Sequence, residues 1–510
     1  MEGASDMTQR EYEDTINRLN SSLEQLTQMF QLQMQQLQIQ SQQLQIQSQQ
    51  LQDLTELLKA KDEEIARLKE QLNKNSNNSS KPPSSDGYKK PAPKSSRRKS
   101  GKHPGGQEGH PGSNLFAPEV PKTYEYHMPS CCHGCPNTEE CRKNGRVCAR
   151  RQVVDAKVEV SVTEHQQIKI RKCPLNPAVR NVKGEFPEEI TAPVQYGKGL
   201  QALVVALNTY GAVSVQRTHD ILAGVFSLPL SVGSIQAMLR QCAKQLSEIL
   251  PWIREQLSNS PLMHCDETGG RINGKLNWIH FNGNEQFSLL TLNPYRGHKG
   301  MTAIGILPHY SGTIVHDCWA AYWKYPQLNH AICNAHILRE LNGVTENYPE
   351  QKWADDFRKL LLEMKAVADK AHQKEKPALS YYYRHKFSQK YDEIIDAGLL
   401  ANPLPEEPEG KRGRKKKGKI RALIERLQSN KAAVCLFVND LSMPFDNNLA
   451  ERGLRMTKAK FKIAGCFRTS EGCQDYLDIM SYVDSAKKHG KSAYEAICMA
   501  VIGTPELIFD

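Results

Sequence analysis

The 510-residue sequence lacks any apolar run near the roughly 18 residues needed to cross a bilayer. Its first residues are acidic and polar and lack the basic and apolar pattern of a secretory signal. Without an export signal, the fourteen cysteines are expected to be reduced thiols or metal ligands rather than disulfides. We therefore expect a cytoplasmic protein without a membrane partner, and the length predicts several domains.

Charge is unevenly distributed along the chain. Residues 1–72 contain 6 Lys and Arg against 12 Asp and Glu, whereas residues 73–122 contain 10 against 3. Frequent Pro and Gly exclude a packed core from residues 73–122, so this basic linker either follows phosphates or is simply solvated. A second basic run, residues 411–419, has seven basic residues in nine and predicts a phosphate-attracting loop.

Apolar residues recur every seven positions from Ile16 to Leu72. This heptad pattern is typical of a coiled coil, and it predicts a homo-oligomer joined through residues 1–72. A single long helix that packs elsewhere in the chain is the alternative. Polar residues interrupt the second apolar seam and would set register or oligomer number: Gln33, Gln40, Gln47 and Lys61.

Residues 123–195 are rich in cysteine. Cys132 and Cys135 have zinc-knuckle spacing, but the expected second pair is incomplete because the residue three positions after Cys173 is not a cysteine. Cys141 or Cys148 can supply the missing ligand, and free buried thiols are the alternative. We predict a zinc-binding-like domain with four candidate ligands: Cys132, Cys135, Cys148 and Cys173.

Residues 196–250 have the pattern of helices. Two of them, Ser214–Phe226 and Val232–Leu246, are separated by a short turn in which Ser231 is a natural N-cap. Such a pair matches a DNA-binding helix-turn-helix, with phosphate contacts expected from Arg240, Gln241 and Lys244. The same arrangement is also common as a plain packing unit.

Three acidic residues stand at the ends of predicted elements. Pro261–Gly270 is predicted as a strand that presents Asp266 and breaks at two glycines, and Gly312–Asp317 is a second apolar run that ends in an acid. Glu451 follows an Asn-rich helix start. Carboxylates from separate elements suit two Mg²⁺ ions, which prefer oxygen ligands. Surface carboxylates at element ends are the alternative.

The surrounding pattern predicts an α/β fold. Leu276–Phe281 and Phe287–Leu292 are strand candidates, so three strands, a crossover and a fourth strand form a mixed sheet. Cys333 and His336 lie on a predicted helix, where a packed thiol and a hydrogen-bonded imidazole are favoured over a metal site. The helix after Glu451 places cations beside the acids or forms a solvated basic face: Arg452, Arg455, Lys458, Lys460 and Lys462.

Together these motifs resemble the DDE transposases of the insertion-sequence-66 family over nearly the whole chain. The proline-serine linker and the Gly-Gly-Gln-x-Gly-His stretch share the resemblance. The motifs that carry it are His264–Thr268, Asp317–Tyr322, Cys333–His336 and Asp446–Arg452.

The resemblance implies a ribonuclease-H-like core in which Asp266, Asp317 and Glu451 are catalytic ligands of Mg²⁺ or Mn²⁺. It implies cleavage and joining of phosphodiesters at insertion-sequence ends, with element terminal repeats and target DNA as partners, in a bacterial, nucleoid-associated protein. It leaves open whether helper proteins take part. A catalytically inactive, transposase-derived DNA-binding regulator is the alternative, and a self-associating scaffold is a third hypothesis.

The expected domains follow in order along the chain. They are a coiled coil (1–72), a basic linker (73–122), a zinc-binding-like domain (123–195), a helix-turn-helix region (196–250), a first core part (251–345), a helical and basic insertion (346–430) and a second core part (431–510).

Overall fold

The computed structural model describes residues 9–79, 120, 123–154, 159–176, 178–404 and 417–509. Most of the predicted linker 73–122 therefore lies outside the described residues, as does the predicted basic loop over 411–416. No helix in the described part of the chain is long and apolar enough to span a bilayer.

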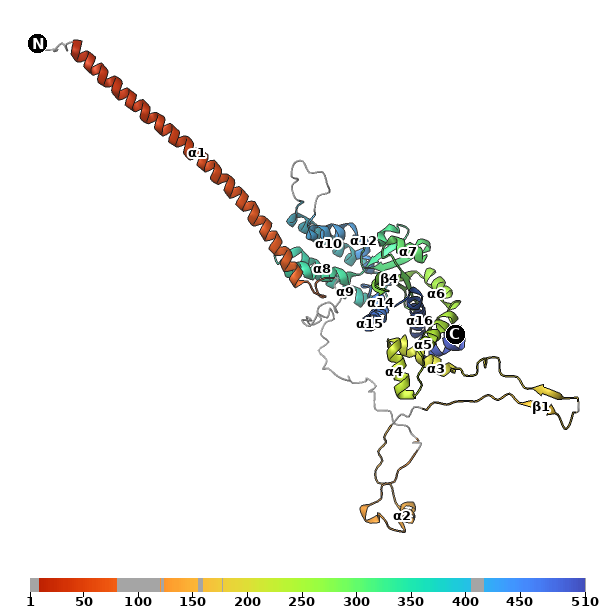
Figure 1. The fold of residues 1–510 in the computed structure, drawn as a ribbon. Coiled ribbons are helices and arrows are strands. Elements are labelled where there is room, and N and C mark those ends of the chain that lie inside the picture. The colour runs from red at the N-terminus through yellow and green to blue at the C-terminus, as the bar shows by residue number, and fades with distance from the viewer. Residues whose placement is uncertain are drawn as a thin grey trace.

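Helix α1, Gln9–Asn73, is a single 65-residue helix that projects away from the rest of the chain (Figure 1). The predicted long helix is confirmed. Apolar residues of its heptad seam face solvent in this single chain; Leu23 and Leu44, for example, are 65% and 66% exposed. A second helix in a coiled coil would cover such a row of exposed apolar side chains. Self-association of the protein stays a prediction.

The cysteine-rich segment has few regular elements. It contains the short 3-10 helix η2, Ser130–Cys132, and helix α2, Thr138–Asn144. Strands β1, Lys169–Lys172, and β2, Arg180–Lys183, form a separate antiparallel hairpin. Figure 1 shows α2 and β1 well apart from each other and from the body of the protein.

The next helices agree with the predicted pair. Helix α3, Lys198–Asn208, precedes α4, Val215–Phe226, and α5, Val232–Gln245. Ser231 caps α5, because its hydroxyl accepts a hydrogen bond from the Ser234 amide at 3.0 Å. The helices share a small core in which Val204, Leu222 and Ile235 are fully buried. Helix α6, Ile249–Ser258, then leads into the sheet.

A five-stranded mixed sheet forms the centre of the fold, in the order β5-β4-β3-β6-β7. Strands β3, β4 and β5 form an antiparallel meander, whereas β6 is parallel to β3 and β7 is parallel to β6. The predicted mixed α/β sheet is therefore confirmed. Its strands are β3 (Leu262–Ile272), β4 (Lys275–Gly283), β5 (Ser288–Asn293), β6 (Thr313–His316) and β7 (Asn329–Ile332).

The predicted end of the first strand was wrong. β3 continues through Asp266 and both glycines, and the chain turns at Asn273-Gly274, where φ is +45° and +76°. Asn-Gly is the residue pair that a tight hairpin favours. Gly270 serves close packing instead, because a Cβ there would lie 2.4 Å from the Phe461 ring.

Helices cover the sheet and form the insertion. Helix α16, Ser470–Lys488, packs along β5, where the Ser481 hydroxyl accepts a hydrogen bond from the Leu290 amide at 2.9 Å. The insertion between β7 and α14 has its own core, which includes Trp353, Phe357 and Tyr391. The remaining elements are α7 (His298–Ile304), η3 (Leu307–His309), η4 (Tyr322–Lys324), α8 (Asn334–Asn347), α9 (Lys352–His372), α10 (Tyr381–Ala401), α11 (Lys419–Ser429), α12 (Lys431–Val434), α13 (Leu436–Asn439), α14 (Asn448–Gly453), α15 (Arg455–Ala464), α17 (Ala493–Ile502) and η5 (Pro505–Ile508).

Candidate active site

Asp266 and Asp317 lie just beyond the paired part of two adjacent parallel strands, β3 and β6. His264 of β3 is in register with Val315 of β6, and each aspartate follows two residues later. Asp317 leaves the sheet directly after β6, and its Oδ1 accepts a hydrogen bond from the Trp319 amide at 3.0 Å. Both carboxylates are half-buried. The sheet thus brings together two residues that are far apart in the sequence.

The electrostatic environment of Asp266 is negative. Burial raises the pKa of its carboxyl to about 7, with further increases from Glu267 and Asp317, while Lys458 acts in the opposite direction. A carboxyl group buried beside other acids resists ionisation, and a bound divalent cation would stabilise its charged form. The oxygen donors of Asp266 and Asp317 therefore fit Mg²⁺ or Mn²⁺ by chemical type.

Asn447 holds the start of α14 against β3. Its Nδ2 donates to the Cys265 carbonyl at 2.8 Å, and its Oδ1 lies 2.7 Å from His264 Nδ1. Side chains alternate along a strand, so His264 and Asp266 share one face, and α14 is placed over that face. Glu451 lies in the first turn of α14, as the sequence predicted.

Glu451 contacts His336 and Arg339 of α8 rather than the aspartates. Its Oε1 lies 3.8 Å from His336 Nε2 and 3.6 Å from the Arg339 guanidinium. Burial, followed by the nearby Arg339 charge, lowers the pKa of His336, while Glu451 and Asp317 raise it. Within the described ranges, no group of three or more His, Cys, Asp or Glu side chains lies close enough together to hold one metal ion.

A second acid beside Asp266 was missed from the sequence. Glu267 is only 7% exposed, and its carboxylate pairs with Arg296 at 2.8 Å and accepts a hydrogen bond from the Tyr322 hydroxyl at 2.8 Å. The Arg296 guanidinium also lies over the rings of Trp278 and Trp319, at 4.9 and 4.1 Å from their centres. This cluster fixes the segment after Asp317. In the sequence, the only indication of a role for Glu267 is its position next to Asp266, and no motif indicates Arg296.

The basic residues after Glu451 do not share one role. Lys458 is close enough to Asp266 to lower the pKa of that carboxyl. Lys460 is buried instead, and its ammonium donates to the carbonyls of Asn208 and Val213 at 2.7 and 2.8 Å. Burial lowers the pKa of Lys460 to about 8. The expectation that Lys460 belongs to a basic face was therefore wrong, because it joins α15 to the end of α3 and to the loop that follows α3.

The predicted zinc ligands are dispersed over two regions. A hydrogen bond with Cys131 raises the pKa of the Cys132 thiol, with smaller effects of the neighbouring Cys141 and Cys135. Cys173 lies beside the separate β1–β2 hairpin, where its sulfur accepts a hydrogen bond from the Asn176 amide at 3.4 Å. None of the six cysteines in residues 123–195 is buried, so the alternative of buried free thiols was wrong.

The sheet and its acids define an α/β protein whose candidate site lies where two adjacent parallel strands stop pairing. A family model described as Transposase IS66 family matches residues 193–475, which include the whole sheet and α14. The chain therefore belongs to the IS66 transposase family, and the resemblance inferred from its motifs is confirmed. Membership implies transposase function and DNA binding.

The N-terminal part of the chain matches a different family. A model described as a family of unknown function (DUF6444) covers residues 5–115, which include α1 and the segment after it. No curated protein matched the chain.

Proposed function

We propose that the protein is a DDE transposase that cleaves and joins DNA at insertion-sequence ends. In cleavage, a water oxygen bonds to phosphorus while the bond from phosphorus to the 3′ oxygen breaks and frees a 3′-hydroxyl. In joining, this hydroxyl attacks a target phosphodiester and displaces the target's own 3′ oxygen. Both steps exchange one phosphorus–oxygen bond for another and need no covalent bond between protein and DNA.

Asp266, Asp317 and Glu451 are the residues that would hold Mg²⁺ or Mn²⁺. When bound, the ions supply activation of the attacking oxygen and stabilisation of the leaving oxygen. The observation that carries the proposal is the placement of Asp266 and Asp317 on adjacent parallel strands in a negative environment. Asn447 supports it, since it fixes α14 and hence Glu451 over the same face.

Neighbouring residues orient these acids and the DNA. The Glu267–Arg296 pair holds Trp319, whose amide in turn donates to Asp317. Lys458 brings a positive charge close to Asp266, where it can attract a DNA phosphate. The meander of three strands followed by two parallel strands supports a ribonuclease-H-like core with a helical insertion.

The other modules would bind DNA and pair protomers. We assign the helix-turn-helix role to α4 and α5, because Arg240, Gln241 and Lys244 are exposed on α5. The coiled coil of α1 would join two copies so that both element ends are processed together. We retain the zinc-binding-like domain with Cys132, Cys135, Cys148 and Cys173 as a proposal, since Cys132 and Cys135 lie near each other.

The test is nicking of labelled DNA that carries the ends flanking this gene, with Mg²⁺ or Mn²⁺ added. Asp266→Asn, Asp317→Asn and Glu451→Gln should each lower nicking by about 100-fold or more while DNA binding is retained. Asp396→Asn, an exposed acid on α10, is the matched control and should nick normally. Full activity of any triad variant would remove that residue from the site.

A chain that binds these ends but nicks them with neither metal would instead be a DNA-binding regulator derived from a transposase. A chain that neither binds nor nicks would be a scaffold.

A further inference from the structure

Helix α8 links two regions that are far apart in the sequence. Its first turns face α14, where Arg339 approaches Glu451 at 3.6 Å. Its last turns face the end of α1, where Asn347 Oδ1 accepts a hydrogen bond from Asn73 Nδ2 at 3.1 Å. The helix has 14 residues and is therefore about 20 Å long. One rigid element thus touches both the N-terminal helix and the candidate active site.

The segment after α1 folds against α8. Asn78 Nδ2 donates to the Glu346 carboxylate at 2.7 Å and to the Asn73 carbonyl at 2.8 Å. The Ser79 hydroxyl donates to the Asn75 carbonyl at 2.6 Å, which closes the turn of the segment. Asn78 and Ser79 are only 6% and 8% exposed, although most of α1 faces solvent. Burial of polar side chains with satisfied hydrogen bonds indicates specific docking.

Gly343 permits a close approach between this segment and α8. A Cβ at Gly343 would lie 2.5 Å from the Asn78 carbonyl oxygen. A glycine inside a helix makes the helix less stable than an alanine would by about 1 kcal/mol. Gly343 therefore weakens α8 but allows the Asn78 carbonyl to approach the helix closely.

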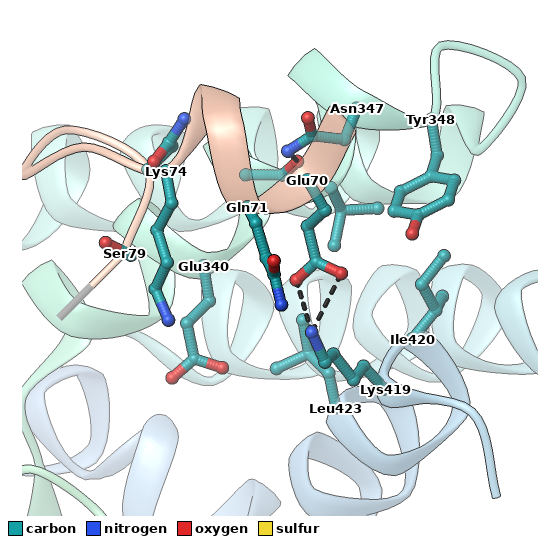
Figure 2. A pocket seen from close by; sticks show the side chains of 13 residues that line it. Glu70, Gln71, Lys74, Ser79, Glu340, Asn347, Tyr348, Lys419, Ile420 and Leu423 are labelled. Carbon is teal, nitrogen blue, oxygen red and sulfur yellow. Dashed lines mark hydrogen bonds and ion pairs between the residues drawn. The ribbon is translucent and has the colours of Figure 1, made fainter. Parts of the chain in front are cut away.

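Helix α11 completes the junction. Lys419 Nζ contacts both oxygens of Glu70 at 2.7 and 2.8 Å, as the dashed lines in Figure 2 show. A cavity of about 730 Å³ lies between α1, α8 and α11. Figure 2 shows Lys74 extending from the end of α1 toward Glu340 of α8. Glu340 is ion-paired with Arg426 of α11 and follows Arg339 directly, so the junction and the contacts of Glu451 share one stretch of helix.

The opposite end of α8 is fastened to the start of α14. The backbone N–H of Asn447 donates to the sulfur of Cys333, the N-cap residue of α8, at 3.1 Å. The same Asn447 holds α14 against β3. A shift of α8 therefore moves both the His336 and Arg339 side chains beside Glu451 and the contact that anchors α14.

We propose that the Asn73–Ser79 segment positions Glu451 through α8. This inference rests on the proposed function, because it takes Glu451 as a catalytic ligand. Asn78 and Gly343 are positioning residues that act at the far end of α8. The arrangement gives the N-terminal region, which matches a family of unknown function, a role at the site.

Gly343→Ala in the full-length protein tests the proposal, since its Cβ displaces Asn78 while alanine strengthens α8 itself. Gly199→Ala on α3 is the matched control, because no described atom lies within 4 Å of its Cβ. We expect Gly343→Ala to lower nicking about 10-fold, with unchanged oligomeric state and DNA affinity. The Mg²⁺ concentration for half-maximal nicking should rise, because Glu451 is misplaced rather than removed.

Amide hydrogen exchange gives a readout that does not depend on activity. Peptides of Asn73–Ser79, the first turns of α8, and α14 should all exchange faster in Gly343→Ala and in Asn78→Ala than in the control. Faster exchange of Asn73–Ser79 alone, with normal α14 exchange and nicking, would overturn the inference. If wild-type protein fails to nick, the proposed function falls, and α14 exchange alone then decides whether α8 couples the two regions.

Discussion

Asp266 places folding and the proposed chemistry in conflict. A carboxylate that binds a divalent cation must be ionised, yet burial and the nearby acids Glu267 and Asp317 disfavour its charge in the metal-free protein. The same residue that the proposed reaction needs should therefore weaken the fold when no cation is present. Active sites commonly carry such destabilising features.

This conflict predicts a stabilising effect of Asp266→Asn. The folded-state pKa of about 7 lies above the ordinary value of 3.8, so the folded protein binds the extra proton between these pH values. Protonation of Asp266 removes the cost of its buried charge, so the fold of wild type has its full stability in this respect below about pH 4. That stability is lost as the pH rises toward 7. In EDTA at pH 8, the asparagine variant should be more stable than wild type by about 1–3 kcal/mol.

Denaturant unfolding of both proteins at pH 8 and near pH 4 checks this prediction. The difference between them should disappear at the lower pH, where the aspartate of wild type is itself protonated. Groups far from Asp266 titrate in the same way in both proteins and cancel in the comparison. Equal stability of the variant and wild type at pH 8 would show that the ionised Asp266 carboxylate does not destabilise the fold.

At the scale of elements, close approach of α14 to the sheet places Glu451. Gly453 ends α14 above β4, and a Cβ at this position would lie 2.2 Å from Cε2 of the Phe281 ring. Phe281 is paired with Asp266 across β3 and β4, so the ring and the aspartate share a face. A glycine at the end of α14 is thus needed for the helix to reach that face.

Gly453→Ala should therefore move α14 away from the sheet. We expect about 1–3 kcal/mol of destabilisation from overpacking and a loss of nicking larger than Gly199→Ala causes. Adding Phe281→Leu, which shortens the ring side chain, should restore part of the activity. Thermal unfolding measures the loss of stability, and the nicking assay measures the loss of activity. A Gly453→Ala variant that is as stable and active as wild type would show that α14 tolerates a Cβ at this position.

Much of this arrangement could be predicted from local patterns, and the rest depends on contacts between distant segments. Apolar runs predicted β4, β5 and β6, and an Asn-rich start predicted the helix of Glu451. The local pattern predicts a strand end at Gly270, because the residue that Gly270 packs against, Phe461, is about 190 residues away in the sequence. The pairing of Arg296 with Glu267 has no local signal either, since it joins a loop to a strand.

At the scale of the whole molecule, the sequence predicts an order of modules along the chain, but it does not predict the contacts between them. Nothing in the heptad pattern of α1 indicates that its end docks on the insertion, because that contact uses backbone carbonyls and asparagines rather than an apolar stripe. Likewise, Lys460 connects α15 to the helices that precede the sheet, although its neighbours in sequence suggested a DNA-facing charge. Through these contacts the proposed DNA-binding and pairing modules meet the core.

The last prediction is that the exposed apolar seam of α1 holds copies of the protein together. Leu44 and Leu51 are 66% and 68% exposed and occupy successive positions of the heptad series. Lysine at both positions would place charges in a coiled-coil core, so Leu44→Lys with Leu51→Lys should convert the protein to a monomer. Gln42→Lys with Gln49→Lys adds the same charge outside the seam and should leave assembly intact.

Analytical ultracentrifugation measures the assembly of both double variants, and paired-end joining measures its consequence. The leucine variant should lose coordinated joining of two element ends by about 10-fold or more, because avidity between linked sites is lost. A leucine variant that assembles like wild type would show that α1 packs without a partner copy. The glutamine variant should match wild type in both assays.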